Sequence, residues 1–298
     1  MTENSETTGT ESSARDRADL IKVAAVQMEP KISQKKENLE KLLNFIDEAS
    51  SAGARLIVFP ECALTGYVFQ NQTETAEVAE TVPGPSTDIF AKEAKQKDVY
   101  IVVGMIEIYG LSFYNVAVLF GPEGFIGKYR KMHPWFAAES QWPVTFGDSD
   151  QGYPVFETGL GQIGMMVCYD AWVPEPARIL ALNGADIIAF PTNAVGVPAG
   201  IACPDHILQT RALENHVWVV AADRIGTERG VPFAGRSQII DVYGDVMVEA
   251  SEDKEEIIYA DISPSAATRD KMLVPDLPAS DLWWIRRPDT YSKITSDK

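Results

Sequence analysis

The sequence is poor in the residues that disulfide and metal sites need. Its 298 residues include only three cysteines and three histidines. Cys62, Cys168 and Cys203 are odd in number and far apart, which favours free thiols in a reducing compartment over a disulfide framework. The histidines show no spacing typical of a zinc site. We therefore expect neither a metal ion nor another cofactor.

Basic residues and long apolar runs are also scarce. The chain has 26 Lys and Arg against 43 Asp and Glu, a net charge of -17. Nucleic acids and anionic membranes attract positively charged surfaces, so the charge argues against both as partners. No apolar run reaches the roughly 18 residues of a membrane span. Residues 1–19 are polar and lack the apolar stretch of a signal peptide, so we predict a disordered leader and a cytoplasmic protein.

One glycine-rich stretch matches a nucleotide-binding pattern only in its letters. GLGQIG (159–164) fits G-x-G-x-x-G, but that pattern must follow a strand and open a helix. Here the glycines precede the apolar residues MMVC, so we interpret 159–164 as a turn. The chain has no G-x-S-x-G sequence either, which leaves a serine nucleophile without support.

Short apolar runs alternate with amphipathic segments along most of the chain, and this rhythm predicts an α/β fold with helices outside and sheets inside. The predicted strands are 21–28, 55–60, 99–108, 114–120, 125–131, 163–168, 185–191, 217–223, 235–241, 245–250 and 255–262, and the predicted helices are 33–53, 86–97, 175–183 and 203–215. No linker rich in Pro, Gly or Ser divides the chain. We predict one domain over 20–270 and a tail over 271–298.

Three stretches place a reactive side chain after a strand or in a turn: Glu61 after FP, Lys131 in KYRK and Cys168 before YD. Taken singly, each has an ordinary explanation as an exposed turn carboxylate, a solvated basic run or a buried core thiol. Together they suit one chemistry, because a thiol becomes a nucleophile with the help of a base or a cation. Glu61 can be that base and Lys131 that cation. The turn after Cys168 can supply backbone N–H groups to an oxyanion.

These stretches resemble the nitrilase or carbon–nitrogen hydrolase superfamily. The resemblance rests on FPE (59–61), KYRK (128–131), CYDAWVPEPAR (168–178) and the stretches 180–193 and 209–226, and it covers roughly residues 21–270. It implies a four-layer αββα sandwich with a Glu-Lys-Cys triad, in which Cys168 is the nucleophile, Glu61 the general base and Lys131 the oxyanion clamp.

Further site residues follow from the same resemblance. Glu139, eight residues after Lys131, stands where the amidase branch has a second glutamate. The Tyr169 backbone N–H is expected in the oxyanion hole. Asn193 and Trp135 are additional candidates for substrate binding.

The resemblance implies hydrolysis of a small aliphatic amide to a carboxylic acid and ammonia through a cysteine thioester. An N-carbamoyl amide of the carbamoylputrescine or β-ureidopropionate type, and then a nitrile, are the alternatives, because all three use the same thiol chemistry. Nitrilases tend to have Cys-Trp-Glu where this chain has Cys-Tyr-Asp, which favours the amide. A binding or scaffold protein that keeps the fold is the non-enzymatic alternative; loss of a triad residue would mark it, and none is missing.

The segments 175–183 and 203–215 resemble the helices through which this family pairs its subunits. The tail segment DLWWIRRPDTYSKI (281–294) contains Trp283 and Trp284, and such aromatic residues are typical of protein contacts. We therefore predict a homodimer or a higher homo-oligomer. Packing of the tail within one subunit is the alternative.

Overall fold

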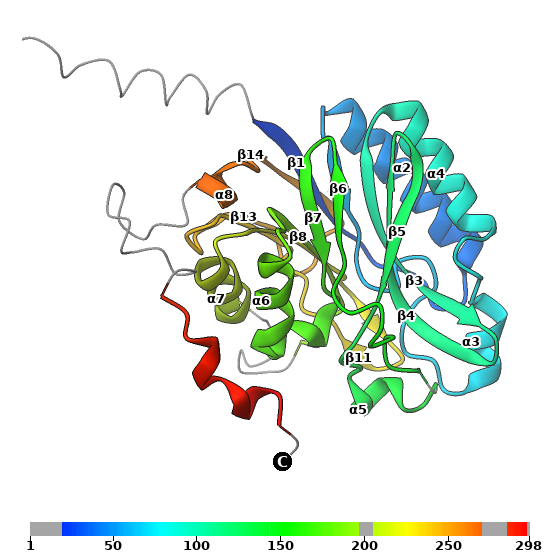
Figure 1. The fold of residues 1–298 in the computed structure, drawn as a ribbon. Helices are drawn as coiled ribbons and strands as arrows, with labels where there is room; N and C mark the ends of the chain where they lie inside the picture. Colours follow the sequence, from blue (N-terminus) through cyan, green and yellow to red (C-terminus); the bar gives the residue numbers. More distant parts are fainter. Residues whose placement is uncertain (1–19, 143, 197–204, 270–284, 297–298) are drawn as a thin grey trace, which may run out of the picture.

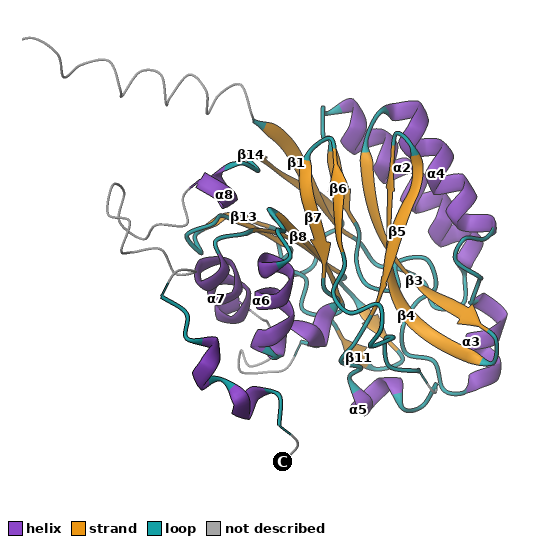
Figure 2. Ribbon diagram, in the orientation of Figure 1, coloured by secondary structure: helices purple, strands orange, loops and turns teal. Residues whose placement is uncertain are grey.

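Two six-stranded mixed sheets lie face to face, and helices cover the outer side of each (Figure 1). The computed structural model describes residues 20–142, 144–196, 205–269 and 285–296. The first sheet has the order β14-β1-β2-β3-β4-β5 and the second β13-β12-β9-β8-β7-β6. Figure 2 shows the strands as two central layers between helical layers. The predicted four-layer αββα sandwich is confirmed.

The elements have the following bounds. The strands are β1 Ile21–Gln27, β2 Leu56–Val58, β3 Tyr100–Tyr109, β4 Ser112–Gly121, β5 Gly124–Arg130, β6 Val155–Thr158, β7 Gly161–Met165, β8 Ile187–Thr192, β9 Trp218–Asp223, β10 Thr227–Glu228, β11 Val231–Pro232, β12 Gln238–Ile240, β13 Val246–Glu249 and β14 Glu256–Ile262. The α-helices are α2 Lys35–Ser51, α3 Gln72–Val78, α4 Pro85–Lys97, α5 Phe136–Glu139, α6 Pro174–Leu182, α7 Asp205–Asn215 and α8 Ala266–Arg269. Three 3-10 turns cover Cys168–Trp172, Pro288–Thr290 and Ser292–Ile294.

Each sheet buries both of its faces, which explains why its strands are apolar on both sides. In β1, Val23 and Ala25 pack into the core between the sheets, while Ala24 and Val26 pack into the core beneath α2 and α4. This alternation follows from the two-residue period of a strand. On the other side of the molecule, α6 and α7 cover the second sheet with a core that includes Leu180.

Several short elements were not predicted, because they are too short to show a hydrophobic period. They are α3, α5, α8, β6 and the β10–β11 hairpin. Helix α3 is mostly polar and begins where the Asn71 side chain accepts a hydrogen bond from the Glu74 N–H, 3.0 Å away. The glycine-rich stretch 159–164 precedes no helix, but the predicted turn is shorter than expected: only residues 159–160 turn the chain, Thr158 pairs with Gly161, and 161–164 already belong to β7.

One predicted strand ends earlier than the sequence suggested. We expected the strand 163–168 to end at the cysteine, but β7 ends at Met165. Beyond it, the Val167 N–H donates to the Asp170 carboxylate instead of to a neighbouring strand. Cys168 therefore begins a separate 3-10 turn.

Some predictions fall outside the described residues: the leader 1–19, Cys203 and the tryptophan pair Trp283 and Trp284. Among the helices that the structure does describe, none has the length and apolar character needed to cross a bilayer.

Candidate active site

The ends of several strands bring the predicted residues to one edge of the sandwich. Strands β7, β8 and β9 are parallel to one another, and β1, β2 and β3 are likewise parallel. Glu61 follows β2, Lys131 follows β5, Cys168 follows β7 and Asn193 follows β8. In open α/β sheets, ligand sites form outside the carboxyl ends of strands, and this arrangement has that form.

Lys131 lies between two carboxylates in the protein interior. Its Nζ is 2.7 Å from Glu61 Oε1 and 3.1 Å and 3.2 Å from the two oxygens of Glu139. All three side chains have no more than 1% of their surface exposed. The structure thus brings the predicted base, cation and second glutamate into one hydrogen-bonded cluster.

Asn115 joins the same cluster, and sequence reasoning missed it. Its Nδ2 donates to Glu61 Oε1 at 2.6 Å and to Glu139 Oε1 at 2.8 Å. It comes from β4, whose other residues between 114 and 120 are apolar or aromatic. A single amide in a buried strand was the available signal, because buried polar groups need partners.

Opposing effects set the charge of this cluster. Burial alone lowers the pKa of Lys131, but Glu139 and Glu61 outweigh it and raise that pKa well above its usual range. Burial raises the pKa of Glu139; Lys131 opposes the rise and the Glu61 charge adds to it. The lysine is therefore firmly cationic, and the cluster has one more carboxylate than it has cations.

One oxygen of Glu61 is left without a partner. Lys131 and Asn115 both bind Oε1, while the buried Oε2 has no hydrogen-bond partner. A buried carboxylate oxygen in this state loses hydration without compensation. It is suited to accept a proton from a group that enters the site.

The candidate nucleophile occupies a strained turn. Cys168 has φ of 47°, in the left-handed region that residues with a Cβ rarely adopt. The buried Asp170 carboxylate holds this turn by accepting from the Val167 N–H, the Tyr129 hydroxyl and the His133 N–H, each at 2.9 Å. Since Tyr129 and His133 flank Lys131, Asp170 fixes the thiol turn to the segment that carries the lysine.

The surroundings of the Cys168 thiol shift its pKa in opposite directions. We expected Lys131 to favour the thiolate, but burial raises the pKa of Cys168, and the Glu61 charge raises it further. Lys131 and hydrogen bonds from the Thr192 side chain and the Asn193 backbone lower the pKa only in part. The raised pKa favours the neutral thiol, and such a group needs a base to remove its proton before it can act as a nucleophile.

The remaining predicted residues differ in their placement. The Asn193 side chain is 2% exposed, and neither of its amide atoms has a partner. The Trp135 N–H donates to Glu139 Oε2, so this residue fixes the second glutamate through its backbone. The Tyr169 side chain is half-exposed and packs against Trp172, while the oxyanion role of its N–H stays a prediction.

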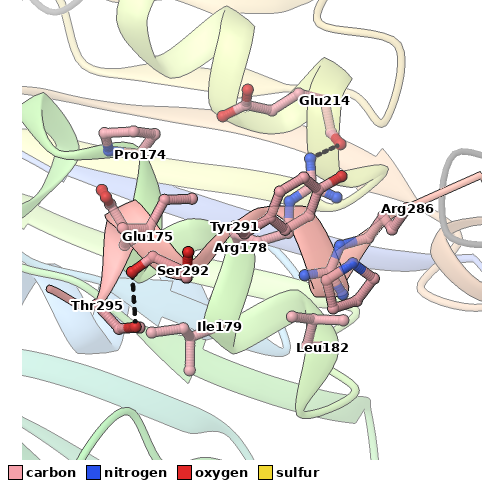
Figure 3. A pocket seen from close by; sticks show the side chains of 12 residues that line it. Pro174, Glu175, Arg178, Ile179, Leu182, Glu214, Arg286, Tyr291, Ser292 and Thr295 are labelled. Carbon is pink, nitrogen blue, oxygen red and sulfur yellow. Dashed lines mark hydrogen bonds between the residues drawn. The ribbon is translucent and has the colours of Figure 1, made fainter.

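A cavity of about 470 Å³ lies apart from this cluster, between α6 and the C-terminal segment 285–296 (Figure 3). It is lined by Arg178, Leu182, Arg286 and Tyr291, among others. None of its lining residues belongs to the cluster around Lys131. Within the described part of the chain, no three His, Cys, Asp or Glu side chains are grouped so that they could hold a metal ion.

An α/β sandwich with a thiol, a lysine and two carboxylates at one sheet edge defines the class of protein. The carbon-nitrogen hydrolase family model matches residues 22–272. The chain belongs to this family, and it is a hydrolase of non-peptide C–N bonds. The placement of Glu61, Lys131 and Cys168 is consistent with the triad that the sequence predicted.

Named relatives of the chain differ in activity. A nitrilase of Pyrococcus abyssi is 44% identical over 82% of this chain and 90% of its own length. An (R)-stereoselective amidase of a Pseudomonas species is 34% identical over 84% of this chain and 88% of its own length. A nitrilase-superfamily structure from Saccharomyces cerevisiae superposes with a TM-score of 0.76 at 26% identity, covering 86% of this chain and 95% of that one. These relatives leave amide and nitrile substrates unresolved.

Proposed function

We propose that the protein hydrolyses a small aliphatic amide to its carboxylic acid and ammonia. Cys168 is the nucleophile, Glu61 the general base and acid, and Lys131 with the Tyr169 N–H the oxyanion hole. Glu139 positions Lys131. The observation that carries the proposal is the unpartnered Oε2 of Glu61, because an amide needs both a base for the thiol and an acid for its departing nitrogen.

The reaction begins with a proton transfer. Glu61 Oε2 takes the proton of the neutral Cys168 thiol as the sulfur attacks the carbonyl carbon. The S–C bond forms, and the carbonyl electron pair moves onto oxygen. Lys131 and the Tyr169 N–H stabilise this oxyanion, and each such donor is worth about 3 kcal/mol of transition-state stabilisation.

Breakdown of this intermediate releases ammonia. The C–N bond breaks while protonated Glu61 returns its proton to the nitrogen, which leaves a thioester on Cys168. Water then attacks the thioester as Glu61 removes one of its protons. The C–S bond breaks, the acid departs, and Glu61 reprotonates the sulfur.

A nitrile is the second candidate substrate, favoured by the 44% identity to a protein named nitrilase. The same thiol can add to a nitrile carbon, so the cluster around Lys131 suits both reactions. The Asn193 amide bears on the choice, because both its donor and its acceptor are unpartnered. A primary amide can satisfy both of these groups, whereas a nitrile nitrogen can only accept.

The test is ammonia release from propionamide, propionitrile and N-carbamoyl-β-alanine at equal concentration, with Cys168→Ala as the blank. We expect propionamide to give the highest kcat/KM. Faster turnover of the nitrile or of the carbamoyl compound would overturn the amide assignment and leave the thiol mechanism in place. Activity that survives in Cys168→Ala would refute the mechanism itself.

A further inference from the structure

Four aromatic side chains form a wall beside the cluster around Lys131, and we call them the aromatic wall: Tyr67, Phe69, Trp142 and Phe233. The Trp142 ring packs edge-on against Tyr67 and Phe69, with ring centroids 6.0 Å and 5.6 Å apart. Phe233 also packs edge-on against Tyr67, with ring centroids 6.4 Å apart. All four are almost completely buried.

The wall is attached to the reacting groups by short stretches of chain. Tyr67 is six residues after Glu61, and Trp142 is three residues after Glu139. Lys131 Nζ lies 6.0 Å from the centroid of the Tyr67 ring. Burial raises the pKa of Tyr67, and the charges of Glu139 and Glu61 raise it further. The Tyr67 hydroxyl therefore stays protonated and lies within electrostatic range of the reacting groups.

Two polar groups of this wall are unused. The Tyr67 hydroxyl and the Trp142 Nε1–H are buried, and neither has a hydrogen-bond partner. The Tyr67 backbone is secured independently, because its N–H donates to Glu228 at 2.9 Å. An unpaired buried donor costs roughly 1–3 kcal/mol, so packing alone would favour phenylalanine at position 67. The unused donors suggest a ligand that carries an acceptor.

The charges near the wall indicate that this acceptor is neutral. The positive charge of Lys131 is already paired with Glu61 and Glu139. The Arg224 guanidinium lies 4.1 Å from the Phe233 ring centroid, but its charge is balanced by Glu228 at 2.9 Å. A carboxylate in the acyl chain would be a third acidic group in a buried site that has two glutamates and one lysine, and its burial without a cation of its own would carry a high cost.

We propose that the Tyr67 hydroxyl and the Trp142 N–H bind an uncharged oxygen in the acyl part of the substrate. The preferred substrate is then a short amide that carries a hydroxyl or ether oxygen, in preference to a plain alkyl amide or one that ends in a carboxylate. This specificity rests on the proposed amide hydrolysis.

The experiment compares kcat/KM for 3-hydroxypropionamide, butyramide and succinamate, three amides of similar length. In the wild type we expect kcat/KM for 3-hydroxypropionamide to be about tenfold higher than for butyramide, because one buried hydrogen bond contributes about that factor. We expect the lowest kcat/KM for succinamate. Tyr67→Phe removes only the hydroxyl and should reduce the preference for oxygen to about twofold or less. Tyr109→Phe, which removes the hydroxyl of an exposed tyrosine, is the matched control and should keep the full preference.

Equal rates for the first two amides, a preference for succinamate, or an unchanged ratio in Tyr67→Phe would each overturn the inference. If Tyr67→Phe fails to fold, the same ratio is measured in Trp142→Phe, where we expect a loss of about threefold. If the enzyme hydrolyses only nitriles, the proposed function fails by itself. The ratio of 3-hydroxypropionitrile to butyronitrile then tests the aromatic wall in the same way.

Discussion

In the proposed mechanism, Cys168 attacks the substrate and Glu61 activates it by removing the proton of its thiol. A thiol that is already ionised at neutral pH needs no base, but burial and the Glu61 charge raise the pKa of Cys168. The thiolate fraction of such a group is small at neutral pH and grows with pH until the raised pKa is reached. In the proposed mechanism Glu61 therefore has to act in every turnover, and the free enzyme should react slowly with thiol reagents that cannot use this base.

Alkylation of the free enzyme by iodoacetamide should accordingly increase about tenfold per pH unit from pH 7 upward, without a plateau below pH 9. Mass spectrometry should find Cys168 modified before Cys62, because Cys62 is completely buried. Cys168→Ala should be folded and inactive. A rate already on its plateau at pH 7 would show that the thiolate exists in the resting enzyme, contrary to this account.

Glu139 should matter for turnover far more than for folding. Glu139→Gln removes one of the two charges that hold Lys131, so we expect kcat to fall at least about a hundredfold, as when a preorganised electrostatic group is lost. Circular dichroism should show the fold intact. An unimpaired variant would mean that Glu139 has no part in positioning Lys131.

Glu107 provides the matched control for this substitution. It is also a buried glutamate, paired with Lys128 and Arg130 of β5, but it lies outside the cluster around Lys131. Removing one partner of such a buried pair costs about 3–5 kcal/mol. Glu107→Gln should therefore lower the urea midpoint while the turnover of the folded enzyme is retained.

At the scale of elements, β3 supports the turn that carries Glu61. A Cβ added at Gly104 would lie 2.4 Å from the Pro60 carbonyl oxygen, 2.5 Å from the Cys62 N and 2.7 Å from the Glu61 Cα. All three are backbone atoms, so no side-chain rotation can relieve the overlap. The close approach of β3 to this turn therefore requires glycine and fixes the position of the base.

Gly104→Ala should displace Glu61 and reduce kcat at least about tenfold, because small displacements of a positioned group are costly. Overpacking should also lower the free energy of unfolding by about 1–3 kcal/mol. Gly164→Ala in β7 is the control: its Cβ would meet a Leu180 methyl group at 2.9 Å, which can move. Urea unfolding and ammonia assays on both variants test this. Equal activity in the two would contradict the supporting role of β3.

At the scale of the whole molecule, the described part of the C-terminal tail packs against α6. Residues 285–296 lie along α6 within the same chain, and Tyr291 and Ile294 share a cavity with Ile179 and Leu182 (Figure 3). This is the arrangement we had considered as the alternative for the tail. Leu182 is nevertheless 44% exposed, so α6 retains apolar surface that a second subunit can cover.

We predict a dimer through the α6 and α7 surface, measured by light scattering at micromolar concentration. Leu182→Glu should shift the protein toward monomer, because it places a charge in the contact. Leu111 lies in the β3–β4 turn and is 95% exposed. As a control, Leu111→Glu should leave the assembly unchanged. A monomeric wild type would reject the dimer.

The sequence by itself determined the parts of this protein that depend on local patterns. Apolar runs of strand length and amphipathic helices such as α2 predicted an α/β fold with helices outside. The family resemblance carried by FPE, KYRK and CYD implied the four-layer sandwich and the roles of Glu61, Lys131, Cys168 and Glu139. These features could be predicted because side-chain periodicity and motif spacing are properties of neighbouring residues.

Only the tertiary structure decided what surrounds those groups. Asn115 and the aromatic wall come from segments distant in sequence from Cys168, and no local pattern shows that they share a site. The neutral resting thiol is also a tertiary property, because burial and the distance to Glu61 set its pKa. Desolvation and charge interactions depend on distances across the folded chain, so they exist only once the two sheets have packed together.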